Sequence, residues 1–132
     1  MSLVVDASVL SEVLLQTPKG RAAEPFLRTH TVHVPELIYV EVVSTLRGWV
    51  RGDLVTKPRA NQALVDLGVF PSRKWPHAPL LPRIWRLRDN MSAYDATYVA
   101  LAEILGFPLL TADSALVRAI RIASKCPVIE VT

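Results

Sequence analysis

The sequence has little cysteine, few glycines and no long apolar run, and each of these absences excludes a class of protein. Its single cysteine, Cys126, excludes an internal disulfide and favours a reducing, cytoplasmic setting. No apolar run reaches the length of about 18 residues that a membrane span needs, and Met1 and Ser2 lead directly into an apolar strand. We therefore expect neither a membrane segment nor a signal peptide. No glycine-rich turn follows that strand, which argues against a dinucleotide-binding motif.

The composition is that of one folded domain spanning residues 1–132. Hydrophobic residues make up 51% of the chain, which is enough for a core, and the charged fraction of 20% lies below the usual value of about 25%. The net charge is +3, because 15 Lys and Arg residues outnumber 12 Asp and Glu residues. If several acids gather at one site, the remaining surface is more basic still, which suits a nucleic-acid partner.

Short apolar strands alternate with amphipathic helices along the chain, which predicts an α/β fold. We expect strands at 3–6, 31–34, 109–111 and 128–131, and helices at 7–15, 21–28, 36–50, 56–67, 81–88, 92–105 and 114–123. The clearest local signal lies between Ser92 and Asp113. Ser92 is a candidate helix cap with Asp95 three residues later, Gly106 ends the helix, and an apolar strand then leads to Asp113.

Three other segments have weaker signals. Residues 17–20 resemble a turn, and residues 69–70 a brief strand after a helix that stops at Gly68. Residues 71–82 hold four prolines and are expected to form a surface loop. The helices around residues 53–68 form a possible clip that stands off the sheet, and both a solvated hairpin and a partner-binding role remain open.

Four carboxylates stand at positions where they can meet. Asp6 and Asp113 each follow a strand, Asp95 begins a helix, and Glu41 lies in an unusually apolar helix. Taken singly, three of them are ordinary helix caps or first-turn acids. Together they are expected to converge at the carboxyl edge of a parallel sheet, where α/β folds place their sites. Their mutual repulsion would be relieved by a hard divalent cation, Mg²⁺ or Mn²⁺, and the lack of a neighbouring His or Cys disfavours zinc.

Several motifs give the chain a resemblance to a known family. Val4-Val5-Asp6-Ala7-Ser8, the apolar helix around Glu41, the block Tyr94-Asp95-Ala96 with Ala100-Leu101-Ala102, and Leu110-Thr111-Ala112-Asp113 resemble PIN-domain ribonucleases, in particular the VapC-type toxins of bacterial toxin–antitoxin pairs. The resemblance covers essentially the whole chain and implies a three-layer α/β/α fold with a short, mainly parallel sheet of four to five strands.

The same resemblance implies the function. Asp6, Glu41, Asp95 and Asp113 would be the catalytic, metal-binding acids, with Ser8 as a supporting hydroxyl. The implied reaction is Mg²⁺- or Mn²⁺-dependent hydrolysis of RNA, with structured RNAs such as tRNA as common targets. The implied partners are a second copy of the chain, as a homodimer, and a small antitoxin protein.

Basic residues outside the acidic set are candidates for contact with RNA. Arg73 and Lys74 lie beside Trp75, and Arg86 and Arg88 lead toward Asp95. A solvated loop and a salt-bridged exposed face, which would include Arg83, are the alternatives.

Two other functions remain to be tested. One is a non-catalytic PIN-like module that binds RNA or protein. The other is an aspartate-dependent phosphatase, which is disfavoured because Ser8 stands where such an enzyme needs a second acid.

Overall fold

A computed structural model describes all 132 residues of the chain. Five parallel strands form one sheet in the order β3-β2-β1-β4-β5. The strands are β1 (Ser2–Val5), β2 (Thr31–Pro35), β3 (Arg73–Trp75), β4 (Leu109–Thr111) and β5 (Val128–Glu130). The predicted α/β fold with a short parallel sheet is confirmed.

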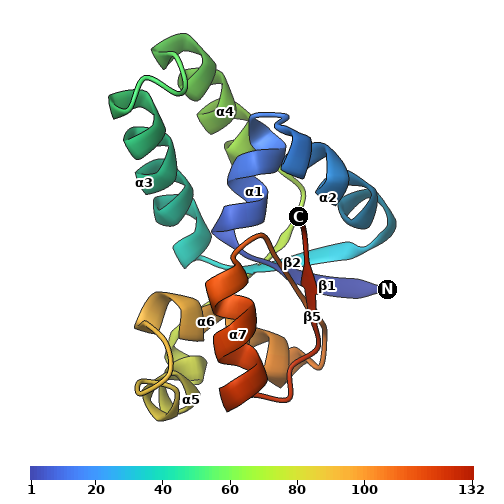
Figure 1. Cartoon of the computed structure of the whole chain (residues 1–132). Helices are drawn as coiled ribbons and strands as arrows, with labels where there is room; N and C mark the ends of the chain where they lie inside the picture. The colour runs from blue at the N-terminus through green and yellow to red at the C-terminus, as the bar shows by residue number, and fades with distance from the viewer.

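Helices cover both faces of this sheet (Figure 1). They are α1 (Ala7–Leu14), α2 (Pro18–Thr29), α3 (Leu37–Arg51), α4 (Lys57–Val69), α5 (Leu81–Arg86), α6 (Ala93–Leu105) and α7 (Ser114–Ala123), with a short 3₁₀ turn η1 (Ala78–Leu80) before α5. In Figure 1, α1 to α4 lie on one side of the sheet and α5 to α7 on the other. Leu3, Val4 and Val5 of β1 are completely buried, as expected for a parallel strand that is covered on both faces.

The strand order places a topological switch point between β1 and β4. From β1 the chain continues to β2 and β3 on one side of the sheet, and it later returns to β4 and β5 on the other side. The two central strands pair directly, with Val4 opposite Leu109 and Val5 opposite Leu110. In open α/β sheets the crevice outside the carboxyl ends of such strands is the usual ligand site. Asp6 follows β1 at this point, and Asp113 closely follows β4.

The strongest local signals of the sequence are confirmed. Ser92 caps α6 by accepting a 3.1 Å hydrogen bond from the N–H of Asp95. The helix ends at Gly106, whose φ of 74° is the left-handed conformation that glycine adopts readily. Strand β4 and helix α7 occupy the predicted residues.

Three local predictions are wrong. Thr17 is not part of a free turn but caps α2, which begins directly at Pro18. Helix α4 continues through Gly68 to Val69, so no strand forms at 69–70. The segment 71–82 is not only a loop, because it contains the edge strand β3.

Strand β3 forms because contacts with the neighbouring strand order a segment whose own sequence does not predict a strand. It pairs with β2 in parallel register, with His33 opposite Arg73. The Trp75 Nε1–H also donates a 3.0 Å hydrogen bond to His33 Nδ1. The prolines lie outside these three residues, and an edge strand needs ladder bonds on one side only.

The predicted clip corresponds to α4, which packs against α3 and α1. Figure 1 shows that α3 runs away from the sheet and that the loop joining it to α4 lies far from the strands. A partner-binding role for this helix pair remains a prediction. None of the helices combines the length and apolarity that a membrane crossing requires.

Candidate functional site

Asp6 is the most buried carboxylate at the switch point, and both of its oxygens accept hydrogen bonds. It is the N-cap of α1, where Oδ1 accepts hydrogen bonds from the N–H of Val9 (3.1 Å) and from Ser8 Oγ (2.6 Å). Oδ2 accepts a 2.5 Å hydrogen bond from Thr111 Oγ1. Burial raises the pKa of the Asp6 carboxyl to about 6, and the nearby charge of Asp95 adds to this rise. The three hydrogen bonds act in the opposite direction.

Two hydroxyl groups join Asp6 to the turn between β4 and α7. Ser8 Oγ donates to Asp6 and accepts a 3.0 Å hydrogen bond from the N–H of Ala112. Thr111 Oγ1 donates to Asp6 and accepts a 3.1 Å hydrogen bond from the N–H of Asp113. Each hydroxyl therefore donates its proton to the Asp6 carboxylate and accepts a backbone N–H of the β4–α7 turn, so that each connects the two sides of the switch point.

Asp113 is both a helix cap and a member of the acidic group. Its Oδ1 accepts hydrogen bonds from the N–H groups of Ala115 (2.9 Å) and Leu116 (3.1 Å) at the start of α7. The cap holds one carboxylate oxygen toward the helix, and the side chain remains partly exposed. The cap interpretation and the site interpretation thus apply to the same residue.

Asp95 and Glu41 come from two other helices and lie within electrostatic reach. Burial raises the pKa of Asp95, and the charges of Asp113 and Glu41 raise it further. Glu41 is half-buried on α3, with Oε1 fully buried and without a hydrogen-bond partner. It lines a groove of about 460 Å³ whose wall includes Ser44 and Tyr94. The buried Oε1 shows that Glu41 does not simply extend into solvent.

The four acids therefore form one electrostatic group, with Asp95 coupled to each of the other three. In the side-chain arrangement of this structure, no three acidic, histidine or cysteine groups form a set that could hold a metal ion. The raised pKa values of Asp6 and Asp95 show that negative charge here is unfavourable without a cation or proton.

Two residues of this region were not predicted as site residues. Thr111 was expected only as part of a strand, although a hydroxyl in the run Leu-Leu-Thr just before Asp113 is a usable signal. Tyr98 lies in the helix predicted at 92–105; it is 2% exposed, but its hydroxyl has no hydrogen-bond partner. Its position three residues after Asp95 places it on the same face of α6.

The basic residues predicted to contact RNA lie around the periphery. Arg73 and Lys74 are exposed on the edge strand β3, two strands away from β1. Arg86 and Arg88 are exposed at and after the end of α5, and the Arg88 guanidinium lies 4.4 Å from the centre of the Trp85 ring. Arg88 also lines an apolar hollow that reaches Ser92, the cap of the helix that carries Asp95. None of the four basic residues forms an ion pair.

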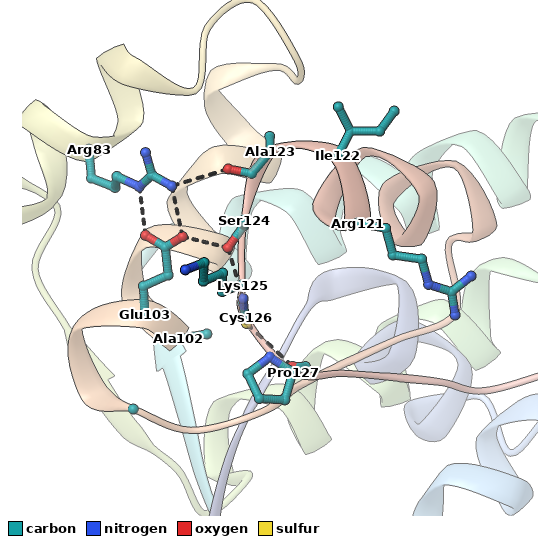
Figure 2. A pocket seen from close by; sticks show the side chains of 11 residues that line it. Arg83, Ala102, Glu103, Arg121, Ile122, Ala123, Ser124, Lys125, Cys126 and Pro127 are labelled. Carbon is teal, nitrogen blue, oxygen red and sulfur yellow. Dashed lines mark hydrogen bonds and ion pairs between the residues drawn. The ribbon is translucent and has the colours of Figure 1, made fainter.

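Arg83 does not share this exposed face. It makes a bidentate ion pair with Glu103, at 2.6 Å and 2.9 Å, and Ser124 Oγ donates to the same carboxylate (Figure 2). This network borders a separate hollow of about 750 Å³ near the end of α7, in which Arg121 points away from the ion pair (Figure 2). The hollow includes none of the four acids, and its one carboxylate is already paired, so we assign the network a structural role.

Comparisons with known proteins agree with this geometry. The PIN domain family matches residues 3–122. Ribonuclease VapC12 of Mycobacterium tuberculosis is 40% identical over 114 residues, which cover 86% of this chain and 88% of that protein.

Two solved structures share the fold. The structure of PAE2754 from Pyrobaculum aerophilum has a TM-score of 0.69 at 21% identity and covers 97% of this chain and 83% of its own. A toxin–antitoxin complex from Klebsiella pneumoniae has a TM-score of 0.58 at 19% identity and covers 86% and 88%. The acids at the switch point, the strand order and these matches lead to one conclusion: the chain belongs to the PIN-domain family, with VapC ribonucleases among its relatives.

Proposed function

We propose that this protein is an endoribonuclease that hydrolyses RNA phosphodiester bonds, and that it is the toxin of a toxin–antitoxin pair. The observation that carries the proposal is the gathering of Asp6, Asp113, Asp95 and Glu41 from four separate helices at one end of the parallel sheet. A fold that needed these residues only as caps would have no reason to bring Glu41 to the same place. The similarity to proteins named as VapC ribonucleases supports the choice of RNA as substrate.

The site residues fit a hard divalent cation, Mg²⁺ or Mn²⁺, in donor chemistry. All four supply only carboxylate oxygen atoms, which are the ligands that such a cation prefers. Such an ion, when bound, would lower the pKa of a water molecule and stabilise charge on the phosphoryl oxygens. Coordination of one ion by three of these acids would need them to lie closer together than in this structure.

The residues of the chain have distinct tasks in this scheme. Ser8 and Thr111 hold both oxygens of Asp6, so that this carboxylate is fixed before any ligand arrives. The cap of α7 fixes Asp113 in the same way. Asp95 has fewer hydrogen bonds and is the acid free to adjust to a ligand. The exposed basic residues Arg86 and Arg88 would hold the phosphate backbone.

RNA cleavage by purified protein tests the proposal. We expect cleavage in Mg²⁺ or Mn²⁺, none in excess EDTA, and a loss of at least about 100-fold in Asp6→Asn and Asp95→Asn. Asp53→Asn is the matched control, because Asp53 is an exposed loop residue at φ 58°, a conformation that Asn also tolerates.

The other outcomes identify other functions. Cleavage that persists in EDTA would contradict the metal-dependent mechanism. RNA binding without cleavage, unchanged in Asp6→Asn, would instead indicate a non-catalytic module. Turnover of an aryl phosphate that depends on Asp6 would indicate a phosphatase.

The proposed protein partner is a cognate antitoxin, and we expect the pair to act in the cytoplasm. Support comes from the toxin–antitoxin complex with the same fold, and from the exposed apolar residues Val40 and Val43 on α3. Co-purification with the product of a short adjacent reading frame, and suppression of cleavage by that product, would test this partner. Light scattering of the isolated chain would test the proposed homodimer.

A further inference from the structure

The acidic site contains a buried hydroxyl group that the scheme above leaves without a role. Tyr98 is 2% exposed, yet its Oη makes no hydrogen bond. Leaving a buried hydroxyl unpaired costs about 1–3 kcal/mol, and a phenylalanine would fill the same space without that cost. The hydroxyl therefore needs an explanation other than packing.

The surroundings of the Tyr98 hydroxyl offer such an explanation. Glu41 Oε1 is also buried and also without a partner. The Tyr98 hydroxyl lies near the Glu41 carboxylate and the N–H of Ala7, and it faces the charge of Asp6. A donor and an acceptor that are both unpaired are thus neighbours inside the same site.

The donor character of Tyr98 is secure. Burial raises the pKa of its hydroxyl far above the ordinary value, and the Glu41 and Asp6 carboxylates raise it further. A tyrosine hydroxyl is protonated near neutral pH even at its ordinary pKa of about 10, so the group is available as a donor. An ionised Glu41 can only accept, so the direction of a hydrogen bond between them is fixed.

We propose that Tyr98 is a positioning residue, whose hydroxyl donates a hydrogen bond to Glu41 Oε1 and thereby turns the other oxygen, Oε2, toward the ligand of the acidic site. This inference rests on the proposed function. Without the bond, Glu41 is a long side chain at the rim of a groove, free to swing toward solvent. With the bond, one of its two oxygens is engaged and the other has a set direction. Tyr98 itself does not touch the substrate.

A matched control exists within the chain. Ser11, in the middle of α1, is completely buried and its Oγ likewise has no partner. Ser11→Ala and Tyr98→Phe each delete one buried, unpaired hydroxyl and little else. A purely structural role predicts the same outcome for both: unchanged or slightly higher stability, with unchanged metal binding and activity.

The first measurement is a double-mutant cycle for thermal unfolding without metal, using Tyr98→Phe, Glu41→Ala and the double variant. We expect Tyr98→Phe to lower Tm by about 3–6 °C when Glu41 is present and not to lower it when Glu41 is Ala. Ser11→Ala should change Tm equally in both backgrounds.

The second measurement is Mn²⁺ binding by electron paramagnetic resonance, with kcat and KM for RNA cleavage. We expect Tyr98→Phe to bind Mn²⁺ about 10-fold more weakly and to lose kcat with KM unchanged, while Ser11→Ala behaves as wild type. Additive Tm changes, or wild-type Mn²⁺ binding by Tyr98→Phe, would overturn this inference and leave the proposed function standing. A wild-type protein that neither binds Mn²⁺ nor cleaves RNA would overturn the proposed function, and this inference with it.

Discussion

Thr111 Oγ1 donates a 2.5 Å hydrogen bond to Asp6 Oδ2 and so joins two residues that lie 105 positions apart in the chain. The same oxygen accepts the N–H of Asp113. Thr111 is completely buried, so neither bond competes with water. A single hydroxyl therefore connects the first and the last of the four acids.

Replacing Thr111 with Val should destabilise the protein by about 1–3 kcal/mol, because Oδ2 of Asp6 and the N–H of Asp113 both lose their partner while remaining near the core. Chemical unfolding measures the loss. Thr111→Ser keeps the hydroxyl and should cost less, with RNA cleavage largely retained. A larger loss in Thr111→Ser than in Thr111→Val would show that the methyl group, rather than the hydroxyl, is the important part of Thr111.

The buried Asp6 should give the metal-free protein a specific pH dependence. Its pKa is about 6 when folded, against 3.8 for an ordinary Asp, because burial disfavours the charged form. The stability it contributes is therefore full below pH 3.8 and is lost as the pH rises through 6, by about 3 kcal/mol in total. The raised pKa of Asp95 acts in the same direction.

The comparison that isolates this effect is wild type against Asp6→Asn, from about pH 4 to about pH 8. Other titrating groups, such as His33, whose pKa is lowered by burial and by Arg73, contribute to both proteins. The wild type should lose stability relative to Asp6→Asn as pH rises, and saturating Mg²⁺ at about pH 7.5 should reverse the trend. Parallel stability curves would refute the prediction.

Reversing the charge of Arg86 and Arg88 should weaken RNA binding and make it less sensitive to salt. Removing one arginine–phosphate interaction lowers the slope of log K against log salt by about one. Arg51→Glu is the control, because Arg51 is an exposed arginine at the far end of α3. Fluorescence anisotropy with labelled RNA gives both slopes. An unchanged slope would indicate that the two arginines are part of a solvated surface and do not contact phosphate.

Replacement of two glycines, one at a time, with alanine should change the stability of the protein in opposite directions. A Cβ at Gly20 would lie 2.2 Å from the backbone O of Glu12, so α1 and α2 would have to separate, at a cost of about 1–3 kcal/mol or more. A Cβ at Gly48 meets nothing within 4 Å, and alanine there should stabilise α3 by about 0.5–1 kcal/mol. Thermal unfolding of both variants checks the pair, and destabilisation by Gly48→Ala would contradict the prediction.

The parts of the fold that could be predicted are those with local signals. Ser92, Gly106 and Asp113 define helix ends through their own side chains or backbone, and the helices and strand between them were predicted correctly. Strand β3 was missed because its order comes from β2 and from the bond between Trp75 and His33, which lie 42 residues apart.

The same distinction applies to the site. The four acids lie within or beside regular elements, so their general location could be inferred from topology. Ser8 was predicted as a supporting hydroxyl, but the bonds that Ser8 and Thr111 make across the switch point depend on which atoms meet there, and periodicity carries no information about that. The pairing of Arg83 could not be foreseen for the same reason, since its partner Glu103 lies on another helix, 20 residues further along the chain.

The central position of β1 in the sheet has a consequence for folding during chain synthesis. Asp6 is synthesised 105 residues before its partner Thr111, which is closely followed by Asp113. Strand β1 acquires its second neighbour only when β4 is made. A nascent or prematurely terminated chain that lacks β4 and Asp113 therefore cannot assemble the acidic group, so any activity that depends on it begins only after these residues are made.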